Sequence, residues 1–134
     1  MPVELEIVSP EKLVLSRPVE MVVLPAYEGE MGVLPGHAPM IVLLRGGMIR
    51  LYEGGQVKEQ LYVSGGFAEV TPERVTVLAT EATPAADVSR AEGEKRLAAA
   101  EADYAAADKA DVVTLDAAMD RMQSARAMVE AAAA

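Results

Sequence analysis

The chain of 134 residues contains no cysteine and no tryptophan, and it has only one histidine, His37, and one phenylalanine. The lack of cysteine excludes disulfides, a thiol nucleophile and thiolate metal ligands. A single histidine leaves a catalytic dyad or a metal site without its usual second member. Because aromatic residues make up only 4% of the chain, we expect an aliphatic core.

Basic residues are also scarce, since 12 lysines and arginines stand against 21 acids and the net charge is −9. This acidity disfavours binding to nucleic acid and favours a basic partner. Residues 1–20 lack the basic start and apolar run of a targeting signal. No apolar run approaches the ~20 residues that a membrane span needs. We therefore expect any membrane association to go through another protein.

Composition changes sharply at Pro84. All eight prolines and nine of the ten glycines lie at or before this residue, whereas 19 of the 24 alanines lie after it. Proline and glycine mark turns, and alanine favours helix. The sequence therefore predicts two domains, residues 1–84 and residues 85–134.

Short apolar or alternating runs, separated by turn residues, fill the first domain. The predicted strands cover residues 3–7, 13–15, 19–24, 40–44, 48–52, 57–63, 67–70 and 75–79. We read Arg17-Pro18 as a break, and we expect the apolar run 40–44 to be covered on both faces. Closely spaced short strands predict an all-β sandwich or flattened barrel.

Residues 29–40 combine glycines, prolines and the histidine between two strand-like runs. Because glycine and proline restrict the backbone to particular shapes, we predict a rigid loop with a short strand at Val33-Leu34. His37 is then interpreted as a loop residue that hydrogen-bonds locally. Glu28 and Glu30 are interpreted as solvated acids.

The sequence of the second domain predicts an antiparallel two-helix hairpin. Asp87 is a candidate cap, and Ser89 with Glu92 has the spacing of a capping box. The first helix is expected to end near Ala107, and the second to run from about residue 112 to about residue 130. Alanine-rich faces bury little area, so we expect the hairpin to dock on something and to change position. Arg90 at the helix start is either solvated or a phosphate ligand.

Five segments resemble the epsilon subunit family of F-type ATP synthase in order and spacing. They are residues 29–39, 47–50, 62–70, 75–79 and 87–91. The resemblance implies a non-catalytic rotor subunit whose β-sandwich clamps the gamma subunit and sits on the c-subunit ring, coupling proton flow to ATP synthesis. It also implies a peripheral protein on the cytoplasmic side of a bacterial inner membrane. The residues expected to contact gamma and the c-ring are Glu28, Glu30, Met31, His37 and Met40.

The resemblance further implies a regulatory role for the hairpin. In the family the hairpin folds against the sandwich or extends toward the beta subunit, and some members bind ATP in the folded form. No cofactor is required. The positions that correspond to the ATP site are Glu81, Asp87, Arg90, Ala91, Arg121 and Arg126. ATP binders of the family place two arginines one turn apart, whereas Arg121 and Arg126 are five residues apart and cannot both lie squarely on one helix face, so ATP binding is left open. Inhibitory members use basic residues of the last helix, which are few here, so we expect weak or absent inhibition.

Two other readings remain open from the residues alone. A free-standing β-sandwich binding or scaffold module with a helical tail would be a monomer with an exposed ligand groove, although few aromatics are available to stack on sugars. An enzyme is disfavoured because no nucleophile motif accompanies the single histidine. Binding to gamma and a turnover screen discriminate among these readings.

Overall fold

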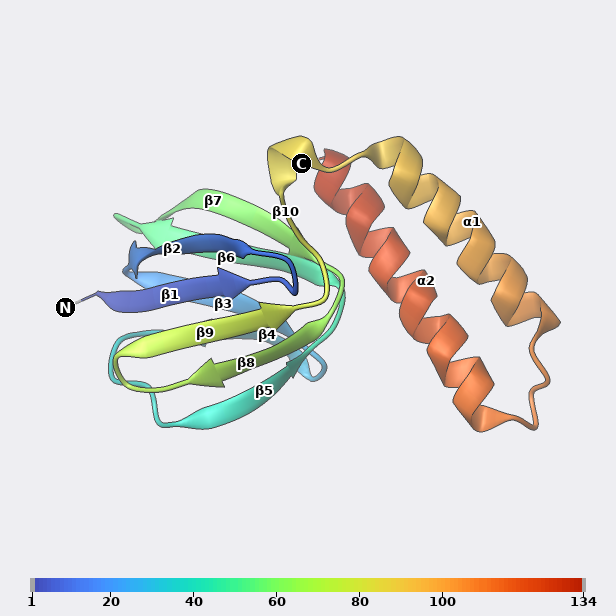
Figure 1. Ribbon diagram of the computed structural model, residues 1–134, viewed down its shortest axis with the longest axis horizontal. Coiled ribbons are helices and arrows are strands. Elements are labelled where there is room, and N and C mark those ends of the chain that lie inside the picture. Colours follow the sequence, from blue (N-terminus) through green and yellow to red (C-terminus); the bar gives the residue numbers. More distant parts are fainter. Residues whose placement is uncertain (1, 134) are drawn as a thin grey trace.

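The computed structural model describes residues 2–133 and consists of a β-sandwich with a helical hairpin at one end (Figure 1). Its strands and helices, in order, are β1 (Val3–Val8), β2 (Leu13–Val19), β3 (Met21–Ala26), β4 (Gly29–Val33), β5 (Met40–Leu44), β6 (Gly47–Glu53), β7 (Gln56–Val63), β8 (Gly66–Val70), β9 (Arg74–Ala79), β10 (Ala82–Pro84), η1 (Ala85–Asp87), α1 (Arg90–Ala106) and α2 (Val112–Ala133). The predicted fold class is confirmed.

The strands form one hydrogen-bonded sheet in the order β10-β7-β6-β3-β5-β8-β9-β1-β2, with β4 added to β3. The sheet folds over at the link between β3 and β5, which consists of the single pair Ala26–Leu44. One layer thus holds β10, β7, β6, β3 and β4, and the other holds β5, β8, β9, β1 and β2. The β3–β5 link is the weakest join in the sheet.

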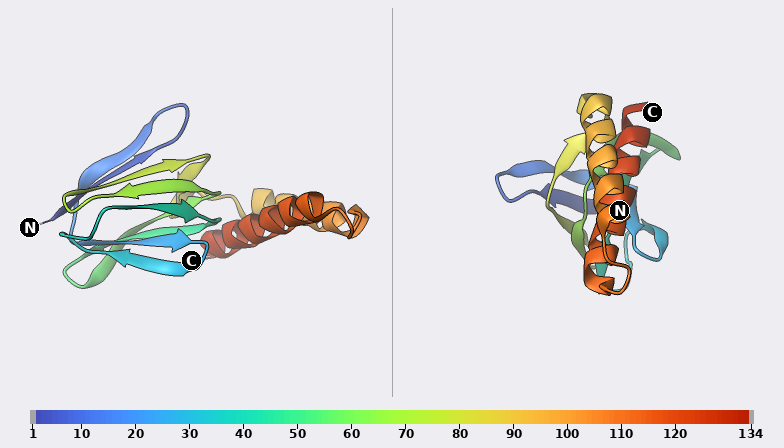
Figure 2. Two further views of the ribbon diagram at one scale, coloured as in Figure 1. Left: turned by 90° about the horizontal axis from the view of Figure 1, so that it is seen from below. Right: turned by 90° about the vertical axis from the view of Figure 1, so that its right-hand side faces the viewer.

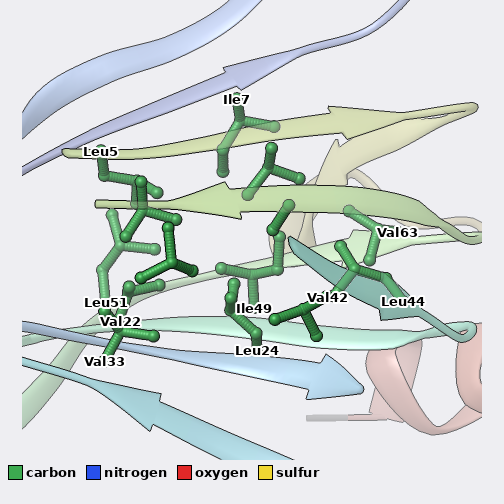
Figure 3. Close-up of a cluster of buried hydrophobic side chains, with 14 of the residues drawn as sticks. Leu5, Ile7, Val22, Leu24, Val33, Val42, Leu44, Ile49, Leu51 and Val63 are labelled. Atoms are coloured by element: carbon green, nitrogen blue, oxygen red, sulfur yellow. The ribbon is translucent and has the colours of Figure 1, made fainter. Parts of the chain in front are cut away.

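The core lies between the layers and is aliphatic, as the composition predicts (Figure 3). Alternate residues of each strand point inward, because side chains in a strand alternate between faces. Leu24, Ile49 and Leu51 are fully buried members of this cluster. Burial of this aliphatic surface is the main force that holds the two layers together.

Three local expectations need correction. β2 runs through Arg17-Pro18 without a break, because proline is tolerated on an edge strand that needs no N–H toward solvent. Residues 29–33 form a full strand, paired with β3 from Val22–Val33 to Ala26–Gly29, so the loop is confined to residues 34–39. The run 40–44 is exposed on one face, where Ile41 is 69% and Leu43 65% exposed.

The hairpin stands beside one end of the sandwich, with α1 and α2 lying side by side (Figure 2). Ser89 caps α1, since its hydroxyl accepts a hydrogen bond from the Glu92 N–H at 3.1 Å. Asp87 belongs to η1 and does not cap the helix. α2 is the helix that packs on the sandwich, mainly on β6 and β7.

Candidate functional site

Four of the five residues expected at a partner interface line one groove. Tyr27 and Glu28 form the turn between β3 and β4, and β5 runs past this turn on the other side of a groove of about 490 Å³. Glu28, Glu30, Met31 and Met40 all line it. The other lining residues are mostly apolar, and we call the two exposed acids, Glu28 and Glu30, the rim of the groove.

Glu30 is held by an ion pair with Arg50 of β6, which reaches it across β3. The Glu30 side chain remains 59% exposed despite this contact. The carboxylate is therefore preoriented on the surface and partly neutralised. No ion pair within residues 2–133 involves Glu28, so no basic side chain of these residues compensates that carboxylate.

His37 lies apart from this groove, in the loop beyond the other end of β4. The loop is tied to the turn between β8 and β9 by a hydrogen bond from the Gly36 N–H to the Pro72 carbonyl, at 2.8 Å. The His37 Nδ1 atom lies 2.8 Å from the Ala38 carbonyl oxygen. The expected local hydrogen bond is confirmed, and the structure does not bring His37 together with Glu30.

An exposed apolar row crosses the outer face of the layer that contains β5. Leu43 pairs with Phe67, Phe67 with Leu78, and Leu78 with Val8, so these four side chains stand in line across β5, β8, β9 and β1. Leu43, Phe67 and Leu78 are 65%, 41% and 40% exposed. We call these four residues the outer apolar row. Sequence reasoning missed it, although apolar residues at consecutive positions of β5 are a signal for burial on both faces.

The hairpin docks on the sandwich through several hydrogen bonds and one apolar contact. The Tyr62 hydroxyl donates to the Ser124 carbonyl at 3.0 Å, and the Gln123 side-chain amide donates to the Gly46 carbonyl. Tyr62 also packs with Met128 and Ala131 of α2. Burial raises the pKa of the Tyr62 hydroxyl above its ordinary value.

The residues proposed from the resemblance as a nucleotide site are only partly brought together. A groove of about 420 Å³ between the helices and Ser64 is lined by Arg121 and by Arg96, but not by Asp87, Arg90, Ala91 or Arg126. Glu81 contacts it indirectly, because both of its oxygens accept hydrogen bonds from Arg96, at 2.8 and 3.0 Å.

Arg96 was not predicted as a site residue, because its partner Glu81 is 15 positions away and lies across the linker. Hydrogen bonds to Glu81, and secondarily to Glu92, raise the pKa of Arg96. Arg121 in turn faces Asp103 at 3.4 Å. The arginines of this groove are thus already paired with carboxylates.

Within residues 2–133, no group of three or more histidine or acidic side chains is arranged to hold a metal ion. No helix among these residues is long and apolar enough to cross a bilayer. The fold therefore defines a β-sandwich with a docked helical hairpin, and its most distinctive surface features are the outer apolar row and the groove beside β5.

Comparison with known proteins places this fold in a family. Residues 2–85 match the family described as "ATP synthase, Delta/Epsilon chain, beta-sandwich domain". The ATP synthase epsilon chain of Granulibacter bethesdensis is 70% identical over 128 residues, which cover 96% of this chain and 95% of that protein. The epsilon chain of Rhodospirillum rubrum is 44% identical over 96% of this chain and 91% of its own length.

Solved structures of similar fold also come from ATP synthases. A chain in the cryo-EM structure of the Euglena gracilis mitochondrial ATP synthase, OSCP/F1/c-ring, has a TM-score of 0.74 and 29% identity, covering 94% of this chain and 80% of that one. A chain of the Tetrahymena thermophila central stalk and c-ring has a TM-score of 0.65 at 14% identity, which shows a shared fold alone. The chain belongs to the delta/epsilon chain family of ATP synthase.

Proposed function

We propose that this chain is a non-catalytic central-stalk subunit that links the gamma subunit to the c-ring and so couples proton flow to ATP synthesis. Its similarity to epsilon chains over nearly its whole length supports this role. The structural observation that carries the proposal is the outer apolar row. Such a row on the surface of a half-buried sheet is typical of a contact with another protein.

The outer apolar row suits the gamma subunit. Burying one large apolar side chain stabilises a contact by roughly 1.5–3 kcal/mol when burial is complete. Leu43 lies at the β5 end of the row and Phe67 lies next to it, and both side chains leave much of their area exposed in the isolated chain. We expect gamma to cover them.

The test is a pull-down of the purified chain with gamma. Phe67→Lys places a charge in the row and is expected to weaken binding at least tenfold. Thr76→Lys is the matched control, because Thr76 lies on the same face one row away, between Glu6 and Glu69. Equal binding by both variants, with unchanged circular dichroism, would argue against this face. A chain that binds no gamma at all would favour the scaffold-module reading.

Glu30 and the His37 loop are proposed to face the polar loops of the c-ring. Glu30→Gln and Glu30→Lys are expected to weaken binding to the ring, with the larger loss for lysine. Arg50→Gln is the control, because it removes the same ion pair but keeps the carboxylate. Loss of binding in Arg50→Gln as well would show that the pair matters only for local structure. This placement makes the chain peripheral to a bacterial inner membrane on its cytoplasmic side.

For the hairpin, we propose at most a weak regulatory contact with the beta subunit. ATP binding remains a prediction, and the geometry opposes tight binding because Arg96 and Arg121 are already paired with carboxylates. A nucleotide would have to displace these partners. Calorimetry of ATP with the isolated chain is expected to show no tight binding, and a strong signal that is lost in Arg121→Ala would reverse this conclusion.

A further inference from the structure

The join between β3 and β5 leaves an open seam in the sandwich. The Tyr27 N–H donates to the Leu43 carbonyl at 3.2 Å, and the Arg45 N–H donates to the Pro25 carbonyl at 2.9 Å. These two bonds flank the single pair Ala26–Leu44. Beyond Tyr27 the chain turns into β4, so β3 leaves the rest of β5 without a neighbour on this side.

The backbone of β5 therefore offers unpaired groups along the seam. Successive residues of a strand direct their N–H and C=O groups to opposite edges. Because Leu43 and Arg45 bond toward β3, Ile41 also directs its N–H and C=O to this side, away from β8. Within residues 2–133, neither the N–H of Leu43 nor these two groups of Ile41 have a backbone partner outside the ladder with β8. The seam is an exposed sheet edge.

Both sides of this edge are apolar. On the outer face, Ile41 and Leu43 are the most exposed large apolar side chains of the sandwich. On the inner side, Met31, Met40 and Val42 line the groove of about 490 Å³. An added strand would therefore meet apolar surface with both of its faces. Natural proteins usually protect such an edge with charges or cover it.

We propose that β5 is completed by an extended segment of the stalk partner, which adds as a strand along the seam and fills the groove beside β4. The segment carries apolar side chains on both faces, and a lysine or arginine that meets the uncompensated Glu28 at the rim. β5 has five residues, so about four residues of the partner suffice. This inference rests on the proposed function, because gamma is the chain expected to supply the segment.

The seam is continuous with the outer apolar row, and this favours a strand from gamma, the chain that is expected to cover the row. Leu43 belongs both to that row and to the open edge, so a chain that covers the row reaches the seam without leaving the surface. A strand added here would extend the layer β5-β8-β9-β1-β2 by one member. Main-chain bonds would give affinity, and the alternating pockets would give specificity.

Ile41→Pro tests the role of the backbone. Proline removes the seam-facing N–H and no bond to β8, and it is tolerated on edge strands. We expect its affinity for gamma to fall about tenfold below that of Ile41→Ala, which loses the side chain but keeps the N–H. Ser16→Pro is the matched control. By alternation from Pro18, its N–H faces the free edge of β2, so binding is expected to match the wild type.

Amide hydrogen exchange provides a second measurement that does not depend on the proline variant folding. The amides of Ile41 and Leu43 are expected to exchange rapidly in the isolated chain and to become protected in the complex with gamma. Equal affinities of Ile41→Pro and Ile41→Ala, or unprotected amides in a formed complex, would overturn the inference and leave the proposed function standing. A wild-type chain that fails to bind gamma would reject the proposed function itself.

A second copy of this chain is the competing occupant of the edge. Concentration-dependent dimers of the wild-type chain, absent in Ile41→Pro and present in Ser16→Pro, would identify self-pairing and contradict the assignment to the stalk partner. We expect the isolated chain to sediment as a monomer at micromolar concentration.

Discussion

The sandwich and the hairpin differ in what they bury. The sandwich encloses a cluster of 19 buried residues, nearly all valine, leucine and isoleucine. The hairpin buries mostly alanine and one glycine, Gly93, whose Cβ position lies 3.1 Å from the Val129 nitrogen. Small residues let the helices approach closely but remove little apolar area from water. The sandwich is therefore the stable frame, and the hairpin depends on its docking contact.

That docking contact is small. It consists of Tyr62 with Met128 and Ala131, and a few hydrogen bonds from α2 to the sandwich edge. Regions with few buried apolar contacts open at lower free energy than the rest of a protein. This contrast leads us to expect the hairpin to open before the sandwich does, and the substitutions below test this expectation.

The largest effect is expected in the sandwich core. Leu51 is fully buried, so Leu51→Ala should lower the free energy of unfolding by about 2–5 kcal/mol. Ala100→Gly in the buried face of α1 should cost only about 1 kcal/mol. Urea denaturation followed by circular dichroism measures both. If the two variants lose similar amounts of unfolding free energy, the hairpin and the sandwich unfold as one cooperative unit, which contradicts the expectation.

The next largest effect is expected at the docking contact. A Cβ at Gly46 would lie 2.5 Å from the Cα of Ser124, so Gly46→Ala should push α2 away at a cost of about 1–3 kcal/mol. Limited proteolysis should then cut the linker at residues 85–89 faster while the sandwich stays intact. Gly32→Ala is the control, because its Cβ would have an ordinary contact 3.6 Å from the Met21 sulfur. If Gly46→Ala is cleaved at the same rate as the wild type, the close contact between Gly46 and Ser124 does not hold α2 on the sandwich.

Sequence patterns predicted much of this contrast. Turn chemistry and alternation located the strands because each is a local signal, as in the Gly54-Gly55 turn between β6 and β7. The Ser89 cap was predictable for the same reason. β10 was missed because three residues paired to a distant strand carry no periodicity. The exposure of Ile41 and Leu43 was missed because a surface that suits a partner has the same composition as a core.

The candidate site was predictable only where its residues are close in sequence. Glu28 in the β3–β4 turn and Glu30 and Met31 in β4 lie within four residues of one another, and the resemblance that singled them out also singled out Met40. By contrast, the pair Arg96–Glu81 depends on how the linker folds back over the sandwich edge. No local pattern specifies that path, since it is set by the packing of α2 on Tyr62.

A smaller, pH-dependent effect is expected from Tyr62. Burial raises its pKa above 10.0, its ordinary value, so the folded state favours the neutral hydroxyl. The stability that it contributes is fully present below pH 10 and is lost as pH rises through the folded-state pKa. Tyr62→Phe should lose about 1 kcal/mol at pH 7 and show less alkaline destabilisation. Glu81 and Arg96 also face Tyr62, with opposing effects on its pKa.

Tyr27 is a second tyrosine at the docking contact whose ionisation contributes to the loss of stability at alkaline pH, and its contribution must be measured separately. Its hydroxyl lies 3.4 Å from Asp120 of α2, and its pKa is also raised, by burial and by this carboxylate. We would measure hairpin opening between pH 9 and 12 by proteolysis of the wild type, Tyr62→Phe and Tyr27→Phe. The difference between each variant and the wild type gives the contribution of that tyrosine to the alkaline opening. An alkaline transition that is identical in all three would come from residues outside the docking contact.

The smallest effect is expected from the ion pair that ties α1 to the end of the sheet. Arg96 and Glu81 are 39% and 36% exposed, so water and salt screen their attraction. Arg96→Gln should cost about 0.5–1 kcal/mol of hairpin docking at low salt, and less at 1 M salt. Arg90→Gln is the matched control, because the one ion pair that Arg90 makes within residues 2–133 is with Glu94 of its own helix. If both variants open the hairpin equally, Arg96 contributes only to the helix, and the sandwich holds the hairpin through α2 alone.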